Sequence, residues 1–284
     1  MTPAEIGGSR RFSGERLRAA GRSATLLVGL AIVGLWVVCA VFGMRIAPLD
    51  PYADNLLATL EPPSFAHWFG TDQLGRDIFS RVIVGTRDIL TVAPLATLLG
   101  TVLGATLGLF VGYYRGILDG VVSRVIEAVQ ALPLVIVALM TLAAVGTSNL
   151  TVVIVIGLVF TPLIARTVRS AVLIESSLDY VTAAQLRGER VFSILFVEIL
   201  PNVMPLILVE ATVRFGYAVF FVASLSFIGF GIQPPSPDWG IAISENYSLI
   251  GTYWWTVLFD ALATASLVIG VNLTADGMQR VLQA

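Results

Sequence analysis

The stretch from Asp179 to Asn202, DYVTAAQLRGERVFSILFVEILPN, is a polar segment between long apolar runs of the chain. Several N-cap candidates precede the adjacent Ala183 and Ala184, which predicts a short helix with small side chains. Gly188 predicts the end of this helix, because glycine adopts the positive φ of a C-terminal cap without strain. From Arg190 to Leu200, apolar residues recur at spacings of three and four, which predicts a second helix. We expect this segment to present its first helix to a partner; the alternative is a surface loop that binds nothing.

The composition of the chain is that of an integral membrane protein. Of its 284 residues, 56% are hydrophobic and 13% are charged, whereas about 25% of the residues in a soluble domain are charged. The apolar residues form blocks of the length that a spanning helix needs, about 20 residues. These blocks are too long and too uniformly apolar for the strands of a membrane barrel. The predicted fold class is therefore all-α, a polytopic membrane protein with six transmembrane helices.

The six spans are predicted from the uncharged runs. The uncharged run between Glu127 and Arg166 is too long for one helix and is interrupted by residues 146–149, so it is divided into a tight hairpin of two spans. The six predicted spans are 24–44, 89–114, the two halves of this hairpin, about 203–231 and about 253–275.

The distribution of arginine predicts that both termini lie in the cytoplasm. In that orientation the internal segments hold Arg10, Arg11, Arg16, Arg18, Arg22, Arg115, Arg124, Arg166, Arg169, Arg187, Arg190 and Arg280. The external side holds only Arg45, Arg76, Arg81 and Arg87, so the positive-inside rule favours this orientation. The first span is longer than a signal-peptide core of about 7 to 15 residues and lacks a small-residue cleavage site, so it is predicted to be an uncleaved anchor.

The predicted organisation follows from these spans. It comprises a cytoplasmic tail (1–23), the first transmembrane helix (24–44), an extracytoplasmic loop with an amphipathic helix (45–88), a five-helix core (89–277) and a cytoplasmic tail (278–284). The core includes the polar loop 170–202, which lies in the cytoplasm between the fourth and fifth spans.

The missing residue types exclude several classes of function. All 17 basic residues are arginine, so the chain has no lysine for a phosphate-binding P-loop or a Schiff base. His67 and Cys39 are the only histidine and cysteine, which are too few for a zinc site of the usual type. Neither a metal site nor a catalytic site is predicted, which argues against a membrane-embedded enzyme. A proton-coupled secondary transporter would need repeated ionisable groups at mid-membrane and usually an internal repeat, and neither is evident.

Three separated motifs resemble the permease subunits of bacterial ABC importers. Thr182-Ala183-Ala184, followed by Gly188 and by Ile199-Leu200-Pro201, is similar to the EAA loop of these subunits. Two other motifs resemble the dipeptide, oligopeptide and nickel permease family, in its second permease type. They are His67 to Arg81, HWFGTDQLGRDIFSR, and Ser224 to Gly240, SLSFIGFGIQPPSPDWG, with NLTADG from Asn272 to Gly277 closing the last span.

The resemblance implies a function in transport. It implies a permease subunit in the bacterial plasma membrane that forms the path for peptides delivered by an extracytoplasmic binding protein. The implied partners are a second, similar permease and two cytoplasmic ABC ATPase subunits. ATP and magnesium would be used by these ATPase subunits, and this chain would bind no cofactor and no nucleic acid. Nickel, haem or another small solute is the alternative cargo, because relatives carry these as well.

The resemblance also implies roles for single residues. The expected ATPase-coupling residues are Thr182, Ala183, Ala184, Arg187, Gly188, Glu189 and Arg190. Thr182 stands where glutamate is usual in the family. The two outer motifs are expected to form much of the surface that meets the binding protein, and packing between these loops is the alternative. The candidate docking residues are Asp72, Arg76, Asp77, Pro234, Pro235 and Trp239, and residues 77–84 are expected to form an amphipathic helix along the outer membrane surface.

Three ionisable residues lie within predicted spans, where charge is costly. Glu210 and Arg214 are one helical turn apart in the acid-first order, so we expect them to neutralise each other. Asp260 has no partner in its own helix. Residues of this kind line a translocation path or pair with another subunit, and both alternatives are open for Asp260.

Overall fold

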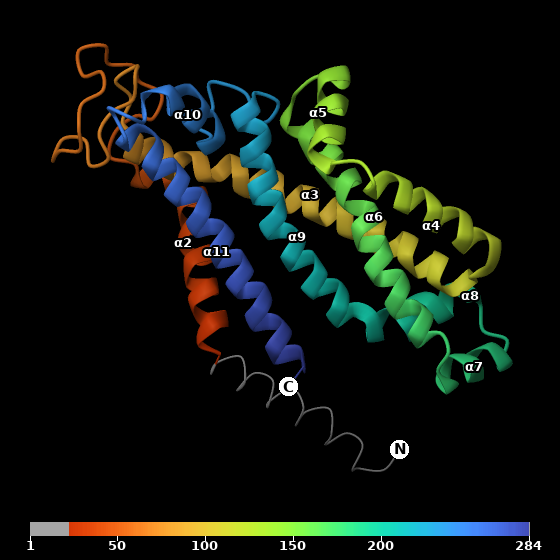
Figure 1. The fold of residues 1–284 in the computed structure, drawn as a ribbon. Coiled ribbons are helices and arrows are strands. Elements are labelled where there is room, and N and C mark those ends of the chain that lie inside the picture. Colours follow the sequence, from red (N-terminus) through yellow and green to blue (C-terminus); the bar gives the residue numbers. More distant parts are fainter. Residues whose placement is uncertain (1–22, 284) are drawn as a thin grey trace.

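The computed structural model describes residues 23–283, and the regular structure in this range is helical (Figure 1). Within the range, the one strand-like contact is an isolated bridge between Thr71 and Asp77. The predicted all-α class is therefore confirmed. The tail 1–22, with its five arginines, lies outside the described residues.

Within residues 23–283, five helices are long and apolar enough to cross a membrane. They are α2 (Ala24–Ile46), α3 (Ile78–Tyr114), α6 (Asn149–Glu175), the continuous run of α8 (Val191–Ser193), η1 (Ile194–Ile199) and α9 (Leu200–Ile228), and α11 (Trp255–Gln283). A sixth crossing is present if the bent pair of α4 (Gly116–Gln130) and α5 (Leu134–Val145) counts as one span. The short helices are α7 (Asp179–Leu186), α10 (Trp239–Asn246) and the 3-10 turn η2 (Tyr247–Leu249).

The third crossing differs from the predicted straight helix. α4 and α5 meet at an angle of 86° around Pro133, which lacks the N–H that a continuous helix would need. With 12 residues, α5 is shorter than the about 20 residues of a full span. The predicted turn after it is present, because Gly146 has a φ of +93° and the Ser148 side chain caps α6. The prediction of a hairpin is therefore correct for its second span, which is the single long helix α6, and wrong for its first span, which is broken into α4 and α5.

Helix α3 begins eleven residues earlier than predicted. The Asp77 side chain caps its start by accepting from the Ser80 backbone N–H at 2.9 Å. Ile78, Val82 and Ile83 are buried in the protein, so the prediction of a separate amphipathic helix along the membrane surface is wrong. These residues form the first turns of a 37-residue helix. At 1.5 Å per residue its length is about 56 Å, well beyond the about 30 Å of the hydrocarbon core.

A row of glycines brings α3 against α6. The glycine row consists of Gly100, Gly104, Gly108 and Gly112. At each of these positions an added Cβ would lie 2.8 or 2.9 Å from a backbone oxygen of α6. Small residues at intervals of four permit such close helix packing in membranes, where dispersion contacts drive association. The row therefore lets the backbones of α3 and α6 approach closely over four successive turns.

The bundle has two distinct ends (Figure 1). α7, the start of α2 and the end of α11 lie at one end, which we call the α7 end. The loop 47–77 and α10 lie at the opposite end, which we call the α10 end. The start of α2, the end of α11 and α7 therefore share one end of the bundle, whereas the prediction that the polar loop and both termini share one side of the membrane stays a prediction. Which side of the membrane that is stays a prediction as well.

Candidate functional site

Helix α7 ends in a tight, glycine-dependent turn. The Glu189 N–H donates to the Ala184 carbonyl at 3.2 Å, and the Gly188 N–H donates to the Gln185 carbonyl at 3.0 Å. These two bonds define a Schellman motif, which requires a left-handed residue after the helix. Gly188 supplies it with a φ of +73°. The predicted glycine turn is confirmed in its geometry.

The two faces of α7 have different surroundings. Val181 and Ala184 are fully buried and belong to the same apolar cluster as Ile194, Leu195 and Ile199 of the π-helix η1. Ala184 therefore makes its close fit within this chain, which corrects the expectation that it contacts an ATPase directly. The exposed face consists of Thr182, Ala183, Leu186 and Arg187, and Leu186 is 84% exposed.

Tyr180 joins three helices through its hydroxyl group. It donates to Glu175 Oε1 at the end of α6 at 2.7 Å, and it accepts from Asn202 Nδ2 of α9 at 3.0 Å. We call this set of Glu175, Tyr180 and Asn202 the Tyr180 bridge. Burial, together with the bond to Glu175, raises the pKa of Tyr180 to about 12, so the hydroxyl keeps its proton at physiological pH. The bridge fixes α7 to the helices on both sides of it in the chain.

The C-terminal half of α7 has weaker contacts. Gln185 Nε2 donates to the hydroxyl of Tyr113 on α3 at 3.3 Å. Arg187 is half exposed and forms a bidentate contact with Glu189 Oε1, through Nε at 3.0 Å and a terminal nitrogen at 2.6 Å. Exposed ion pairs of this kind contribute little to stability, and both side chains are free to exchange partners. Arg190 is exposed, and no bond of its side chain is found among the described residues.

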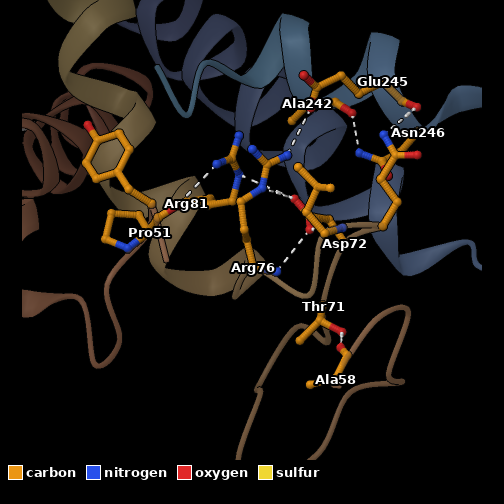
Figure 2. A network of polar contacts seen from close by, with 12 residues as sticks. Pro51, Ala58, Thr71, Asp72, Arg76, Arg81, Ala242, Glu245 and Asn246 are labelled. Carbon is orange, nitrogen blue, oxygen red and sulfur yellow. Dashed lines mark hydrogen bonds and ion pairs between the residues drawn. The ribbon is translucent and has the colours of Figure 1, made fainter. Parts of the chain in front are cut away.

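At the α10 end, the motif from His67 to Arg81 forms an internal ion-pair network (Figure 2). Asp72 Oδ2 accepts from Arg76 Nε at 2.7 Å and lies 3.8 Å from Arg81 Nε. Arg76 reaches across to Glu245 of α10 at 3.1 Å, and Arg81 donates to the Pro51 carbonyl at 3.1 Å. The network joins the loop, the start of α3 and α10.

Four of the six candidate docking residues lie inside the protein. Asp72 and Asp77 are buried, Arg76 is nearly so, and Trp239 is 0% exposed. The Trp239 indole N–H donates to the Val82 carbonyl of α3 at 2.9 Å, which places this ring in the core of the protein. Direct contact with another protein through these four side chains is therefore excluded in this conformation.

Pro234 and Pro235, the other two candidate docking residues, are exposed. They lie on the loop between α9 and α10, at the α10 end of the bundle (Figure 1).

The ionisable residues of the spans are largely satisfied within the chain. Arg214 Nε donates to Glu210 Oε1 at 2.7 Å, and the guanidinium lies 5.6 Å from the ring centre of Tyr217. The predicted neutralisation of this pair is confirmed.

Asp260 is 2% exposed, and its Oδ1 has no hydrogen-bond partner among the described residues. Its side chain is enclosed by this subunit, so neither a path-lining position nor contact with a second permease fits this conformation.

The fold is that of a polytopic helical membrane protein, and helix α7 lies at one end of its bundle with one face exposed. The family described as "Binding-protein-dependent transport system inner membrane component" matches residues 104–284. The chain belongs to this family.

Curated relatives match nearly the whole chain. The dipeptide transport system permease protein DppC of Escherichia coli (strain K12) is 40% identical over 264 residues, covering 91% of this chain and 88% of that protein. The di/tripeptide transport system permease protein DppC of Pseudomonas aeruginosa (strain UCBPP-PA14) is 35% identical, and the match covers 89% of this chain and 86% of that protein. The probable D,D-dipeptide transport system permease protein DdpC of E. coli K12 is 32% identical, and the match covers 96% of this chain and 92% of that protein.

Two features were missed by the sequence reasoning. Leu186 is the most exposed apolar side chain of α7, yet it was not among the predicted coupling residues. Its position three residues after Ala183 was the available signal, because such residues share a helix face. The Tyr180 bridge carried no such signal, since nothing in the sequence spacing relates Tyr180 to Asn202.

Proposed function

We propose that this chain is the permease subunit of an ATP-driven importer that carries di- or oligopeptides across the bacterial inner membrane. The observation that carries the proposal is α7, a helix with one face buried in the subunit and the other free at one end of the bundle. Family membership and the peptide-transporting relatives support it. A second permease, two ATPase subunits and a binding protein complete the proposed complex.

In the proposed mechanism α7 receives force from an ATPase subunit on the cytoplasmic side. Thr182, Ala183, Leu186 and Arg187 form the contact face, and Leu186 fills an apolar recess of the ATPase. ATP and magnesium are bound by the ATPase, so the part of this chain is mechanical. The Tyr180 bridge transmits the displacement of α7 to α6 and α9, because α7 cannot move alone without breaking both hydrogen bonds.

Docking of the binding protein is proposed at the α10 end. The exposed Pro234 and Pro235 supply rigid contacts there, since proline loses little conformational freedom on binding. The ion-pair network of Asp72, Arg76 and Glu245 holds the surface in place from within.

Site-directed crosslinking tests the ATPase contact. In a Cys39→Ala background, Leu186→Cys is expected to crosslink to a cysteine placed in the ATPase surface, and to react with an impermeant thiol reagent only in inside-out vesicles. Ala184→Cys, which is buried on the opposite face of the same helix, is the matched control and should do neither. Labelling of Leu186→Cys from the external side would contradict the proposed orientation.

Transport by the reconstituted complex tests the cargo. Proteoliposomes that contain all subunits and the binding protein should accumulate a labelled dipeptide when ATP is enclosed, and a proton gradient alone should not drive uptake. Uptake of nickel or haem in place of the dipeptide would reject the peptide assignment and keep the importer. Uptake driven by the proton gradient would reject both.

A further inference from the structure

Two adjoining cavities lie between α2 and α3. The smaller has a volume of about 320 Å³ and is lined by the last turns of α2, with Arg45, and by Arg87 of α3. The larger has a volume of about 640 Å³, and its walls include Val37, Leu90 and Phe215. Arg87 lines both cavities, as do Ala40 and Val41 of α2, so the two cavities meet at these residues. Both volumes are within the range of small-molecule sites.

The charge in these cavities has one sign. Both arginines are exposed, and neither guanidinium group forms a hydrogen bond or an ion pair with any other residue in the range 23–283. No acidic residue lines either cavity. Asp88, the neighbour of Arg87, is engaged elsewhere by the hydroxyl of Ser236. The smaller cavity therefore presents two free guanidinium groups, whose planar donor arrays suit phosphate oxygens.

The depth of the arginines matches the level of lipid phosphates. From Ala24 to Arg45, α2 rises by about 32 Å, close to the about 30 Å of the hydrocarbon core. Arg45 lies in the last turn of α2, and Arg87 lies in the third turn of α3 at the same end. Arginines at such positions commonly extend to the headgroup layer. These two differ from a simple extended arginine because an apolar cavity continues from them towards the membrane centre.

We infer that this groove binds one anionic glycerophospholipid. Arg45 and Arg87 hold the phosphate, and an acyl chain lies in the larger cavity against Val37, Leu90 and Phe215. Charge complementarity selects this occupant, because basic pockets between membrane helices bind anionic headgroups and an apolar helix of a partner would leave both charges unpaired. Of the five unbroken spans among the described residues, α2 is the least covered, with 11% of its apolar window buried, so lipid has access to the groove. The inference does not depend on peptide transport or on which leaflet is involved.

Native mass spectrometry of the complex tests the inference. The full chain, co-expressed with its partner subunits, is incubated with equal amounts of phosphatidylglycerol and phosphatidylethanolamine, and the retained lipid is counted. We expect one phosphatidylglycerol per chain, in preference to phosphatidylethanolamine. Arg45→Gln and Arg87→Gln should each reduce its retention about fivefold, which is the effect of removing one basic residue at a lipid surface. Arg124→Gln is the matched control, because Arg124 is exposed but lines neither cavity, and it should retain the lipid.

A second variant separates lipid from the other occupants. Val37→Trp fills the larger cavity and leaves both arginines in place, so it should also lose the lipid while the second permease stays bound. Loss of the second permease with lipid unchanged would show that the groove is a subunit interface and would overturn the inference. Displacement of the lipid by excess inorganic phosphate would indicate a free-anion site and would also overturn it. Equal retention of the two lipids by the unaltered complex would reject it without any variant.

Discussion

Replacement of Gly188 by valine should separate ATP hydrolysis from transport. Gly188 has a φ of +73°, and a Cβ added there would meet nothing within 4 Å. The variant therefore causes no clash within this chain. Its effect must come from the backbone of the turn or from contact with a partner.

The size of the backbone effect follows from the turn geometry. A non-glycine residue in the left-handed conformation costs about 1–2 kcal/mol, and a β-branched residue is at the upper end or beyond. This is small against the about 5–15 kcal/mol that stabilises a folded protein, so the variant should insert and fold. It nevertheless lowers the ratio of molecules with the Schellman turn to molecules without it about 5- to 30-fold, which shifts the population towards a misdirected α7.

Binding-protein-stimulated ATPase activity and peptide uptake are measured side by side in proteoliposomes. We expect Gly188→Val to keep basal ATPase activity and to lose most of the uptake per ATP. Gly188→Asn is the matched control, because asparagine tolerates positive φ, and its uptake per ATP should be close to that of the original protein. If the uptake per ATP of Gly188→Val is within twofold of that of the original protein, the turn has no role in coupling and the reasoning is refuted.

Three further predictions concern the Tyr180 bridge, the glycine row and the cap of α10. Tyr180→Phe removes two hydrogen bonds and should weaken the coupling of ATP hydrolysis to uptake by about 1–3 kcal/mol. In a double-mutant cycle with Asn202→Ala, the losses of uptake per ATP in the two single variants should overlap, and additive losses would contradict a shared bridge. Gly108→Ala places a Cβ 2.8 Å from the Ala165 carbonyl oxygen, so it should lower thermal stability by about 1–3 kcal/mol, whereas Gly120→Ala, which meets nothing within 4 Å, should not. Burial raises the pKa of Asp238 from 3.8 to about 6. Between these two pH values the folded protein holds a proton on Asp238 that the unfolded chain has released. The stabilisation of the folded state by this proton is therefore complete below pH 3.8 and is lost as the pH rises through 6. The melting temperature, followed by tryptophan fluorescence, should therefore rise more between pH 7.5 and 5 in the original protein than in Asp238→Asn, which still caps the helix; equal rises would contradict the assignment.

The sequence predicts the spanning helices well because a hydrocarbon environment permits few alternatives. Uncharged runs such as 24–44 stand out by composition alone. The same criterion failed for α3, because Asp88 was interpreted as the end of a loop although a tertiary partner on another segment satisfies it. It also failed at Pro133, where an apolar run conceals a bend of 86°. Charge and hydropathy detect the membrane, whereas they do not detect tertiary partners or backbone breaks.

The candidate site was predictable only where one turn of helix determines it. The Gly188 turn follows from local backbone chemistry, so its geometry was foreseen. The inward position of Ala184 depends on contacts with η1, which begins ten residues later, and short apolar residues alone do not indicate which surface they contact. The burial of Asp72 and Trp239 likewise depends on α3 and α10, which the sequence did not place together.

The outer motifs have a mechanical consequence for the proposed cycle. A Cβ on Gly85 would lie 2.0 Å from the Pro237 carbonyl oxygen, so the loop between α9 and α10 contacts α3 through the backbone. A Cβ on Gly75 would lie 1.8 Å from the Asn55 carbonyl oxygen, so the loop 47–77 is closely packed on itself. Together with the ion pair from Arg76 to Glu245, these contacts prevent α10 from sliding over the start of α3. Force applied at α7 enters at the other end of the bundle. Since α10 is held against the start of α3 and helix α7 is hydrogen-bonded to α3, α6 and α9, we expect these three helices to pivot about the α10 end, with displacements that grow towards α7.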